Sequence, residues 1–179
     1  MSDTKQKWVI DPAHTEINFK VKHLMITTVT GTFKDYGASI YTTNDDFMTA
    51  EVDFYLDTAS VDTGNADRDG HLKSGDFFDV ENHKQITFVA NTYEAVDNDG
   101  SYELYGDLTI KGITKRIKLD VEFGGVIKDP WGNEKAGFTI NGKVNRKDWD
   151  LNWNAALETG GVLVSDEVRI SCEVQLMRA

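Results

Sequence analysis

Two polar side chains interrupt alternating rows of apolar residues, and they are the first candidates for binding chemistry. His23 continues a row that begins at Ile17, and Arg146 continues a row that begins at Phe138. An inward-facing arginine needs an acceptor, because burying an unpaired charge is costly. Arg146 either forms a structural pair with an acidic loop residue or meets the polar head of an amphiphile, and both interpretations stay open. The acidic candidates for such a pair are Asp69 and Asp148.

A short polar segment is the second candidate. Asn65 is a favourable helix N-cap, and the helix predicted after it runs from Ala66 to about Lys73. Arg68 and His71 lie within this helix. The segment is either a surface helix held by local ion pairs or a lid over an opening, in which case Arg68 or His71 faces a ligand. A second helical turn is predicted at residues 24–28.

Three tryptophans lie in loops or at strand ends, where an apolar ring with a polar N–H is useful. They are Trp131, Trp149 and Trp153. Such residues line an entrance, close the end of a barrel or form a dimer contact, and the sequence leaves these three roles open.

Other chemistries lack a recognisable pattern. The histidines His14, His23, His71 and His83 are scattered without metal-ligand spacing, so no metal site is predicted. There is no nucleophile elbow, phosphate loop or dinucleotide fingerprint. Cys172 is the single cysteine, which excludes an internal disulfide, and its inward position predicts an inert buried thiol. A catalytic pair distant in sequence stays open, with His23 or His71 as the general base.

Alternating hydrophobicity predicts the elements that position these residues. Apolar and polar residues alternate with the period of a strand that has one buried face, and Asn, Asp and Gly separate the runs. The expected fold is an all-β antiparallel barrel of about eight strands with one or two short helices. Tight reversals are expected at 97–100, 111–114 and 129–133. The predicted strands are 7–11, 15–23, 29–42, 49–57, 86–96, 101–111, 114–128, 134–146 and 167–178.

The inward rows make up either a filled core or the wall of an apolar cavity. An eight-stranded barrel is just wide enough for side chains to fill it or for one small ligand to bind. Gly106 and Gly142 fall in these rows, where they either leave space or mark bulges or bends. The residues predicted to line a ligand tunnel are Phe19, Val21, Phe54, Leu56, Phe88, Leu108, Leu119, Val121, Phe138, Ile140, Val144, Ile170 and Val174.

The net charge and the lengths of the apolar runs disfavour several classes of binding partner. A formal charge of −11 over 179 residues disfavours nucleic acid and anionic membrane surfaces. No apolar run approaches the roughly 20 residues of a membrane span. Residues 1–7 do not resemble a signal peptide, which predicts a cytoplasmic protein; removal of a leader would instead place it in the periplasm. Residues 1–6 are expected to be a flexible terminus, and residues 7–178 one domain.

An ordered series of short segments resembles the YceI-like family. The resemblance covers residues 7–178, and its specificity lies in the order of the pieces. They are WVIDPAHT at 8–15, INFKVKHL at 17–24, GTF at 31–33, DRDGHLKS at 67–74, FFD at 77–79, GDLTIKGITK at 106–115, DPWG at 129–132, RKDW at 146–149 and VSDEV at 164–168.

The resemblance implies an elongated, lipocalin-like barrel with a long apolar tunnel. It also implies binding of an isoprenoid lipid, such as a polyprenyl phosphate or a ubiquinone-like quinone, and association as a homodimer. Two departures stand out. Many family members carry a secretory leader, and the family usually has glycine after the aromatic residue of the arginine motif, where this chain has Asp150.

Together these observations predict a non-enzymatic protein that sequesters or transports an isoprenoid lipid or quinone, without a further cofactor. Two alternatives stay open: an enzyme that acts on an apolar substrate, and a filled barrel that works as an interaction or stress-response module. The residues predicted to surround the mouth and the head group are His23, Arg68, His71, Trp131, Arg146 and Trp149.

Overall fold

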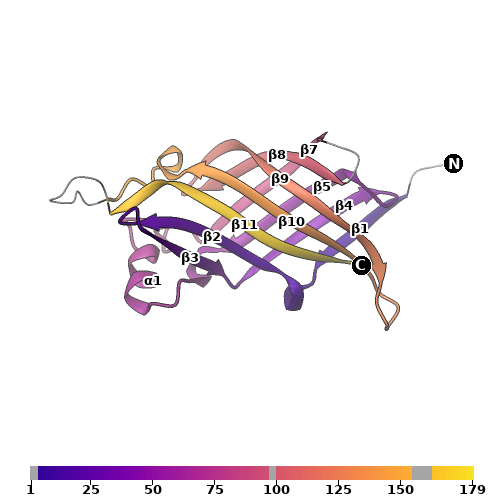
Figure 1. The fold of residues 1–179 in the computed structure, drawn as a ribbon, viewed down its shortest axis with the longest axis horizontal. Helices are drawn as coiled ribbons and strands as arrows, with labels where there is room; N and C mark the ends of the chain where they lie inside the picture. Colours follow the sequence, from indigo (N-terminus) through magenta and orange to yellow (C-terminus); the bar gives the residue numbers. More distant parts are fainter. Residues whose placement is uncertain (1–3, 97–99, 155–162) are drawn as a thin grey trace.

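The computed structural model describes residues 4–96, 100–154 and 163–179, and it is an elongated antiparallel β-barrel with one helix across one end (Figure 1). The strands are β1 (Lys5–Ile10), β2 (Glu16–His23), β3 (Thr27–Phe33), β4 (Tyr36–Thr43), β5 (Asp46–Asp57), β6 (Val61–Asp62), β7 (Gln85–Ala95), β8 (Ser101–Ile110), β9 (Ile113–Lys128), β10 (Glu134–Asn145) and β11 (Val164–Arg178). The helices are α1 (Ala66–Lys73) and the 3-10 turns η1 (Pro12–His14), η2 (Thr58–Ser60) and η3 (Arg146–Trp149).

Eight strands close into the barrel in the order β1-β4-β5-β7-β8-β9-β10-β11, and β11 returns to β1. This confirms the predicted fold class. Strand β11 pairs with β1 near its C-terminal end, where Trp8 lies opposite Arg178. Along the rest of its length β11 pairs with β2, where Phe19 lies opposite Ile170. Strands β1 and β2 therefore act as one wall strand that η1 interrupts.

The wall strand predicted over 29–42 is interrupted in the same way. It divides into β3, which pairs with β2, and β4, which pairs with β1. The break lies at Lys34 and Asp35. Their backbone groups bond to the end of β5 and to the turn that follows it: Lys34 N–H donates to the Ser60 carbonyl, and the Asp35 carbonyl accepts from Asp57 N–H. These backbone groups are therefore not available for pairing with β1 or β2, and the strand is interrupted at this point.

The helical turn predicted at 24–28 is wrong. Leu24 and Met25 have φ values of 54° and 59°, which are left-handed, and Ile26 N–H donates to the His23 carbonyl. Positive φ at both central residues is what a type I′ hairpin turn requires. The chain therefore reverses tightly from β2 into β3, with His23 opposite Thr27.

The other predicted reversals join β8 to β9 and β9 to β10. Lys111 and Gly112 have φ values of 51° and 75° between Ile110 and its partner Ile113. In the second, the Asp129 carboxylate accepts from the backbone N–H groups of Trp131 and Asn133. Both reversals are confirmed. The third predicted reversal includes residues 97–99, which lie outside the described residues.

Helix α1 forms where the sequence predicts it. The Asn65 side chain accepts a hydrogen bond from Arg68 N–H, so the cap is the expected one. The Asp69 carboxylate accepts from both the backbone N–H and the hydroxyl of Thr63. These bonds fix the helix to the chain that enters it, and the helix lies below β2 and β3 at one end of the barrel (Figure 1).

Aromatic side chains fill the opposite end of the barrel interior. The Phe47 ring lies 5.0 Å from Trp8 and 5.0 Å from Phe138, and Phe138 lies 5.1 Å from Phe123. Trp8 is fully buried and donates its indole N–H to the Thr42 hydroxyl. The predicted tunnel is therefore filled at this end, and the remaining space lies towards α1.

A glycine in the β8 wall tests this packing. A methyl group at Gly106 would lie 2.7 Å from Ala90 Cβ and 2.7 Å from the Val89 carbonyl oxygen, and the latter is backbone and cannot rotate away. We expect Gly106→Ala to lower the free energy of unfolding by about 1–3 kcal/mol. Gly70→Ala is the control, because its methyl group meets no atom within 4 Å and should raise the stability of α1 by about 0.5–1 kcal/mol. Urea unfolding measures both, and equal losses would contradict the packing.

A buried carboxylate holds η1 between β1 and β2, and it predicts acid sensitivity. Asp11 accepts from Lys135 Nζ at 2.5 Å and lies 3.1 Å from His14 Nδ1. The hydrogen bond from Lys135 lowers the pKa of Asp11 to about 2, although burial opposes the shift. Because the folded pKa lies below the ordinary 3.8, this contribution is present above pH 4 and is lost as the pH falls from about 4 to 2.

We therefore expect Asp11→Asn to lower the free energy of unfolding at pH 7 by about 2 kcal/mol and to flatten its change between pH 4 and 2. Unfolding curves at several pH values measure this, with the exposed Asp148→Asn as control. An unchanged acid slope in Asp11→Asn would show that other carboxylates dominate.

Candidate ligand cavity

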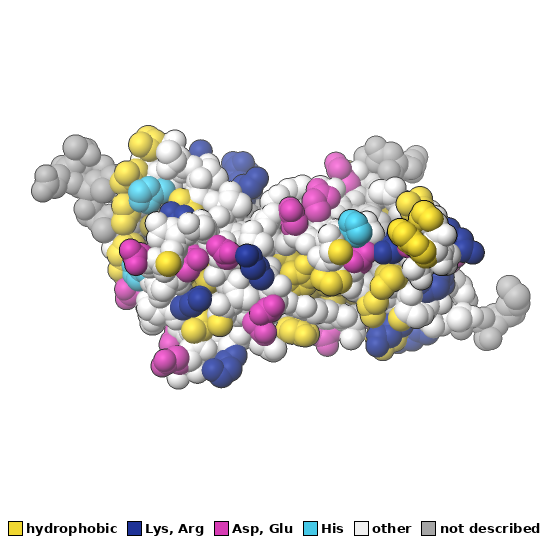
Figure 2. All heavy atoms as spheres, turned by 90° about the horizontal axis from the view of Figure 1, so that it is seen from below, with side chains coloured by type: hydrophobic (Ala, Val, Ile, Leu, Met, Phe, Trp, Pro, Cys, Tyr) yellow, Lys and Arg dark blue, Asp and Glu magenta, His cyan; other side chains and the backbone are white. Residues whose placement is uncertain are grey.

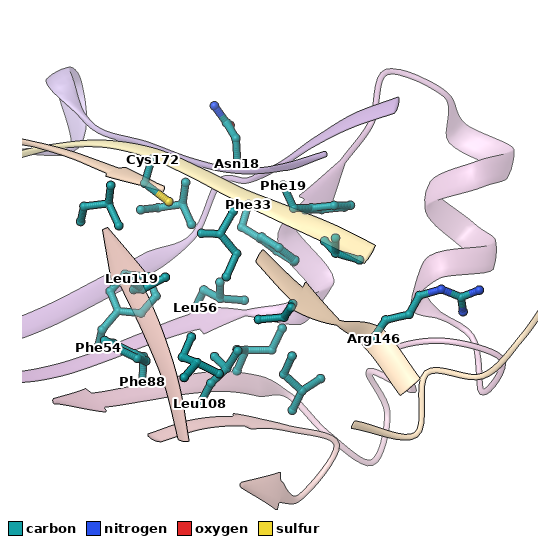
Figure 3. A pocket seen from close by; sticks show the side chains of 18 of the residues that line it. Asn18, Phe19, Phe33, Phe54, Leu56, Phe88, Leu108, Leu119, Arg146 and Cys172 are labelled. Atoms are coloured by element: carbon teal, nitrogen blue, oxygen red, sulfur yellow. The ribbon is translucent and has the colours of Figure 1, made fainter. Parts of the chain in front are cut away.

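An apolar cavity of about 600 Å³ occupies the barrel interior between the aromatic cluster and α1. All thirteen residues predicted to face a tunnel line it. Figure 3 shows Phe19 and Phe33 pointing in from one side, and Phe54, Phe88, Leu108 and Leu119 from the other. Asn18 also borders the cavity, but its side chain points away from it, as the alternation along β2 requires. The inward rows are therefore a cavity wall.

Strand register explains how residues far apart in sequence meet in this wall. Gly142 lies opposite Ile170, Ile170 opposite Phe19, and Phe19 opposite Gly31. The large side chains of Ile170 and Phe19 thus lie between two glycines, which have no side chain. The expectation that Gly142 leaves open space is wrong, because the Leu119 side chain occupies it, 2.6 Å from where a Cβ would stand. Gly106 is filled in the same way by Phe88 and Ala90.

The mouth of the cavity lies beside α1. Arg68, His71 and Leu72 from the helix line it, together with Lys22 and His23 from β2. Five of the six predicted mouth residues line the cavity. They are His23, Arg68, His71, Arg146 and Trp149. Trp131 does not line it. It lies on the turn between β9 and β10, at the end of the barrel opposite α1, and is 82% exposed. The Asp129 carboxylate accepts a hydrogen bond from its backbone N–H and so fixes the turn.

Arg146 is 3% exposed, and backbone carbonyl oxygens surround its guanidinium. It donates to the carbonyls of Ser165, Leu151, Trp153 and Val164. Burial lowers the pKa of Arg146, and the nearby Asp166 carboxylate opposes that shift. Arg146 thus joins the loop after η3 to the start of β11. The predicted acidic partners, Asp69 and Asp148, are replaced by these carbonyls.

Two further polar residues of the mouth, Arg68 and His71, also have internal partners. Arg68 donates through Nε to the Thr63 hydroxyl and through a terminal nitrogen to the Thr63 carbonyl. His71 Nε2 lies 2.8 Å from the Asp76 carboxylate. The His71 ring also packs edge-on against Trp153, with 4.5 Å between ring centroids. These contacts hold α1 against the chain that follows η3.

Trp149 closes the wall beside η3. Its side chain is 1% exposed, and its indole N–H donates to the Leu108 carbonyl at 2.9 Å. The chain then turns at Asp150, which has a left-handed φ of 61°. Glycine adopts that conformation freely, while Asp tolerates it at some cost. The departure at Asp150 therefore preserves the turn and leaves Arg146 in place.

Two tyrosines that the sequence analysis missed also line the cavity. A register shift in β7 between Ala90 and Thr92 turns Tyr93 inward, whereas strict alternation from Phe88 would point it outward. Tyr102 shares the inward parity of Leu104, which was the signal that could have found it. The Tyr93 hydroxyl donates to the Ala50 carbonyl, and burial raises the pKa of both tyrosines. They are neutral phenols in an otherwise apolar wall.

Cys172 also faces this cavity and is buried. Burial raises the pKa of its thiol to about 11, so the thiol is protonated at neutral pH. Within the described ranges, no cluster of three or more His, Cys, Asp or Glu side chains is arranged to hold a metal ion. None of the helices described here is long and apolar enough to cross a membrane.

A closed antiparallel barrel around an apolar cavity is a lipocalin-type binding barrel. The model of the YceI-like domain matches residues 8–176, and the chain belongs to the YceI-like family. A UPF0312 protein from Staphylococcus epidermidis is 40% identical over 170 residues, which cover 94% of this chain and 96% of that protein.

Solved structures share the fold. The YceI protein of Campylobacter jejuni is 37% identical, with a TM-score of 0.74 over 88% of this chain and 90% of its own. A polyisoprenoid binding domain from Saccharophagus degradans is 16% identical, with a TM-score of 0.67 over 96% and 98% of the two chains. The family is one of binding-protein barrels, and with the cavity it supports binding of an apolar ligand by this chain.

The hydrogen bonds of Arg146 predict a structural role that mutation can measure. Arg146→Ala leaves several buried carbonyls without a donor, so we expect the free energy of unfolding to fall by about 3 kcal/mol. Arg68→Ala is the control, because its bonds lie at an exposed helix end and should contribute less than about 1 kcal/mol. Thermal and urea unfolding measure the difference. A stable Arg146→Ala protein that lost affinity for anionic ligands alone would instead assign the residue to a head group.

Proposed function

We propose that this protein binds a long-chain isoprenoid lipid or quinone in the barrel cavity and thereby sequesters or transports it. The observation that carries the proposal is the cavity of about 600 Å³ with an almost entirely apolar wall. Pockets for small molecules commonly measure about 300–1,000 Å³. A polar ligand would leave its hydrogen-bonding groups unpaired against this wall, whereas a hydrocarbon tail loses nothing there.

The tail supplies the binding free energy in this proposal. Each buried CH₂ contributes about 0.8 kcal/mol, and association costs several kcal/mol in lost freedom. The free energy gained by burying a chain of many carbons therefore exceeds the free-energy cost of association, whereas that of a short chain does not. The rings of Phe19, Phe54 and Phe88 give the space a fixed width, which favours a slender, branched chain over a bulky fused-ring molecule.

The internal partners of Arg146, Arg68 and His71 favour a neutral head group. The guanidinium groups of Arg146 and Arg68 are bonded to carbonyl and hydroxyl oxygens, and His71 is bonded to Asp76. An anionic head would have to displace these contacts to gain a bidentate partner. A quinone or an alcohol requires only single hydrogen bonds and leaves them intact. We therefore place quinones and polyprenols ahead of polyprenyl phosphates.

The comparisons support an apolar ligand. The structural neighbour from Saccharophagus degradans is described as a polyisoprenoid binding domain, and its barrel overlaps nearly the whole of this chain. At 16% identity the likeness supports a shared fold only. The proposed class of ligand therefore rests on the apolar cavity of this chain. A filled interaction module, the third possibility raised by the sequence, lacks support because the interior is hollow.

Mass spectrometry of the organic extract of the purified, natively folded protein tests the proposal. A stoichiometric isoprenoid lipid or quinone is the expected result. Competition between a quinone and a polyprenyl phosphate of matched tail length then tests the head group, and tighter binding of the quinone is expected. An empty extract, and no uptake of either lipid when offered, would overturn the proposal.

Filling the cavity provides the matched mutational test. Ile140 faces the cavity beside Val121 and Cys172, and Asn141 follows it on the outer face. We expect Ile140→Trp to abolish lipid binding while the barrel stays folded, because the indole occupies the space of the tail. Asn141→Trp places the same group outside and should leave binding unchanged. Fluorescence titration with a labelled isoprenoid measures both, and full binding by Ile140→Trp would show that the ligand lies elsewhere.

A further inference from the structure

The turn between β2 and β3 exposes large apolar side chains in a strained backbone. Met25 is 56% exposed and Ile26 76%, and both Leu24 and Met25 have positive φ. Turns of this geometry usually carry Asn-Gly, because glycine and asparagine adopt positive φ at little cost. Neither folding nor solubility favours Leu, Met and Ile at these positions. Violations of local preference of this kind are expected at functional sites.

Basic side chains gather on the outer wall that leads to this turn. Lys143 on β10 lies opposite Arg169 on β11, and Arg169 lies opposite Lys20 on β2. Like charges placed side by side across strands are destabilising. Among the described residues, Lys20, Lys22 and Lys143 form no ion pair, and Arg169 approaches only Glu167, at 3.5 Å.

This local charge differs from the charge of the whole molecule. The net charge of −11 predicts repulsion from anionic surfaces, yet of these four cations only Arg169 approaches a carboxylate among the described residues, that of Glu167. At the mouth, Asp76 is bonded to His71, and Asp166 approaches Lys147 at 3.4 Å. Asp76 and Asp166 are thus partly neutralised by their own neighbours, whereas Lys20, Lys22 and Lys143 form no ion pair among the described residues.

The apolar turn and the basic row lie at the mouth of the cavity. Lys22 lines the mouth, and β2 runs from Lys20 directly into the turn. Lys20 and Leu24 are four residues apart, which is about 13 Å along a strand. Figure 2 shows hydrophobic and histidine side chains together at the end of the molecule that carries α1. A flat partner that touched this end could contact both features.

We propose that the α1 end of the barrel docks on the surface of a lipid bilayer that contains anionic lipids. Met25 and Ile26 enter the interface, and Lys20, Lys22, Lys143 and Arg169 meet the lipid phosphates. Apolar side chains flanked by basic ones are the combination that interfacial membrane binding requires. The inference extends the proposed function, because a tail would then pass between bilayer and cavity at the mouth. The docking itself needs no bound ligand.

The other end of the barrel provides matched controls. Ile127 and Trp131 on the β9–β10 hairpin are 68% and 82% exposed, so apolar exposure alone does not distinguish the two ends. That end, however, is filled by the cluster of Trp8, Phe47, Phe123 and Phe138. Lys7 and Lys128 are exposed lysines outside the basic row.

Sedimentation with vesicles tests the proposal with the full chain. Vesicles of phosphatidylcholine with phosphatidylglycerol should bind the protein, and added salt should weaken binding. Met25→Gly with Ile26→Ser should reduce the partition coefficient at least tenfold and should not destabilise the fold, because glycine relieves the positive φ of position 25. Lys20→Gln with Lys143→Gln should reduce it about fivefold per lysine, since each lysine near such a surface contributes about 1 kcal/mol.

The control pairs are Ile127→Ser with Trp131→Ser, and Lys7→Gln with Lys128→Gln, and both should bind as the unmodified chain does. No binding to anionic vesicles, or losses confined to these control pairs, would overturn the proposal. Uptake of a soluble isoprenoid analogue, measured in parallel without vesicles, separates the two hypotheses. A protein that binds the analogue but no vesicle keeps the proposed function and loses the docking surface.

Discussion

The hydrogen-bonded pairing of β11 with both β1 and β2 is the constraint on which the rest of the structure depends. It joins the two ends of the chain, with Trp8 opposite Arg178 and Ile17 opposite Cys172, and it converts a sheet into a barrel. Without closure the inward rows would be one face of an open sheet exposed to water. With closure they face one another across an enclosed space. The register of this pairing also brings Phe19 beside Ile170, so it determines which side chains share a layer of the cavity wall.

The alternation of apolar residues predicted the wall because a strand has only two faces. Once a barrel is closed, one face must be interior, and parity along each run fixes the inward residues without knowledge of the topology. Alternation no longer identifies the inward residues where a strand contains a bulge or a break. The register shift in β7 moves Tyr93 inward, and the break at Lys34 and Asp35 divides one predicted strand into two. The break at Lys34 and Asp35 coincides with backbone hydrogen bonds to Ser60 and Asp57, which a local sequence pattern does not contain.

Arg146 shows a different limit of sequence reasoning. Its inward parity correctly predicted burial and a need for acceptors, but the type of acceptor was not predictable. The carbonyls that bind it belong to Leu151, Trp153, Val164 and Ser165, and backbone groups carry no sequence signal. The turn that presents Leu151 needs the left-handed residue Asp150, which supplies the same conformation as the glycine usual in the family. A buried arginine that appeared suited to a ligand therefore holds the mouth of the barrel together.

A barrel filled at one end imposes a further requirement on the other. An apolar molecule that occupies the cavity has to pass the mouth beside α1, because the rings of Phe47, Phe123 and Phe138 occupy the far end. Hydrogen bonds within the chain hold the mouth, and Arg146, Arg68 and His71 are already bonded there, so these three groups fix the wall. The free energy that moves the tail must then come from apolar contact inside the barrel and from the surface that the mouth faces. Exposed apolar residues in a strained turn at that position are consistent with this division of roles.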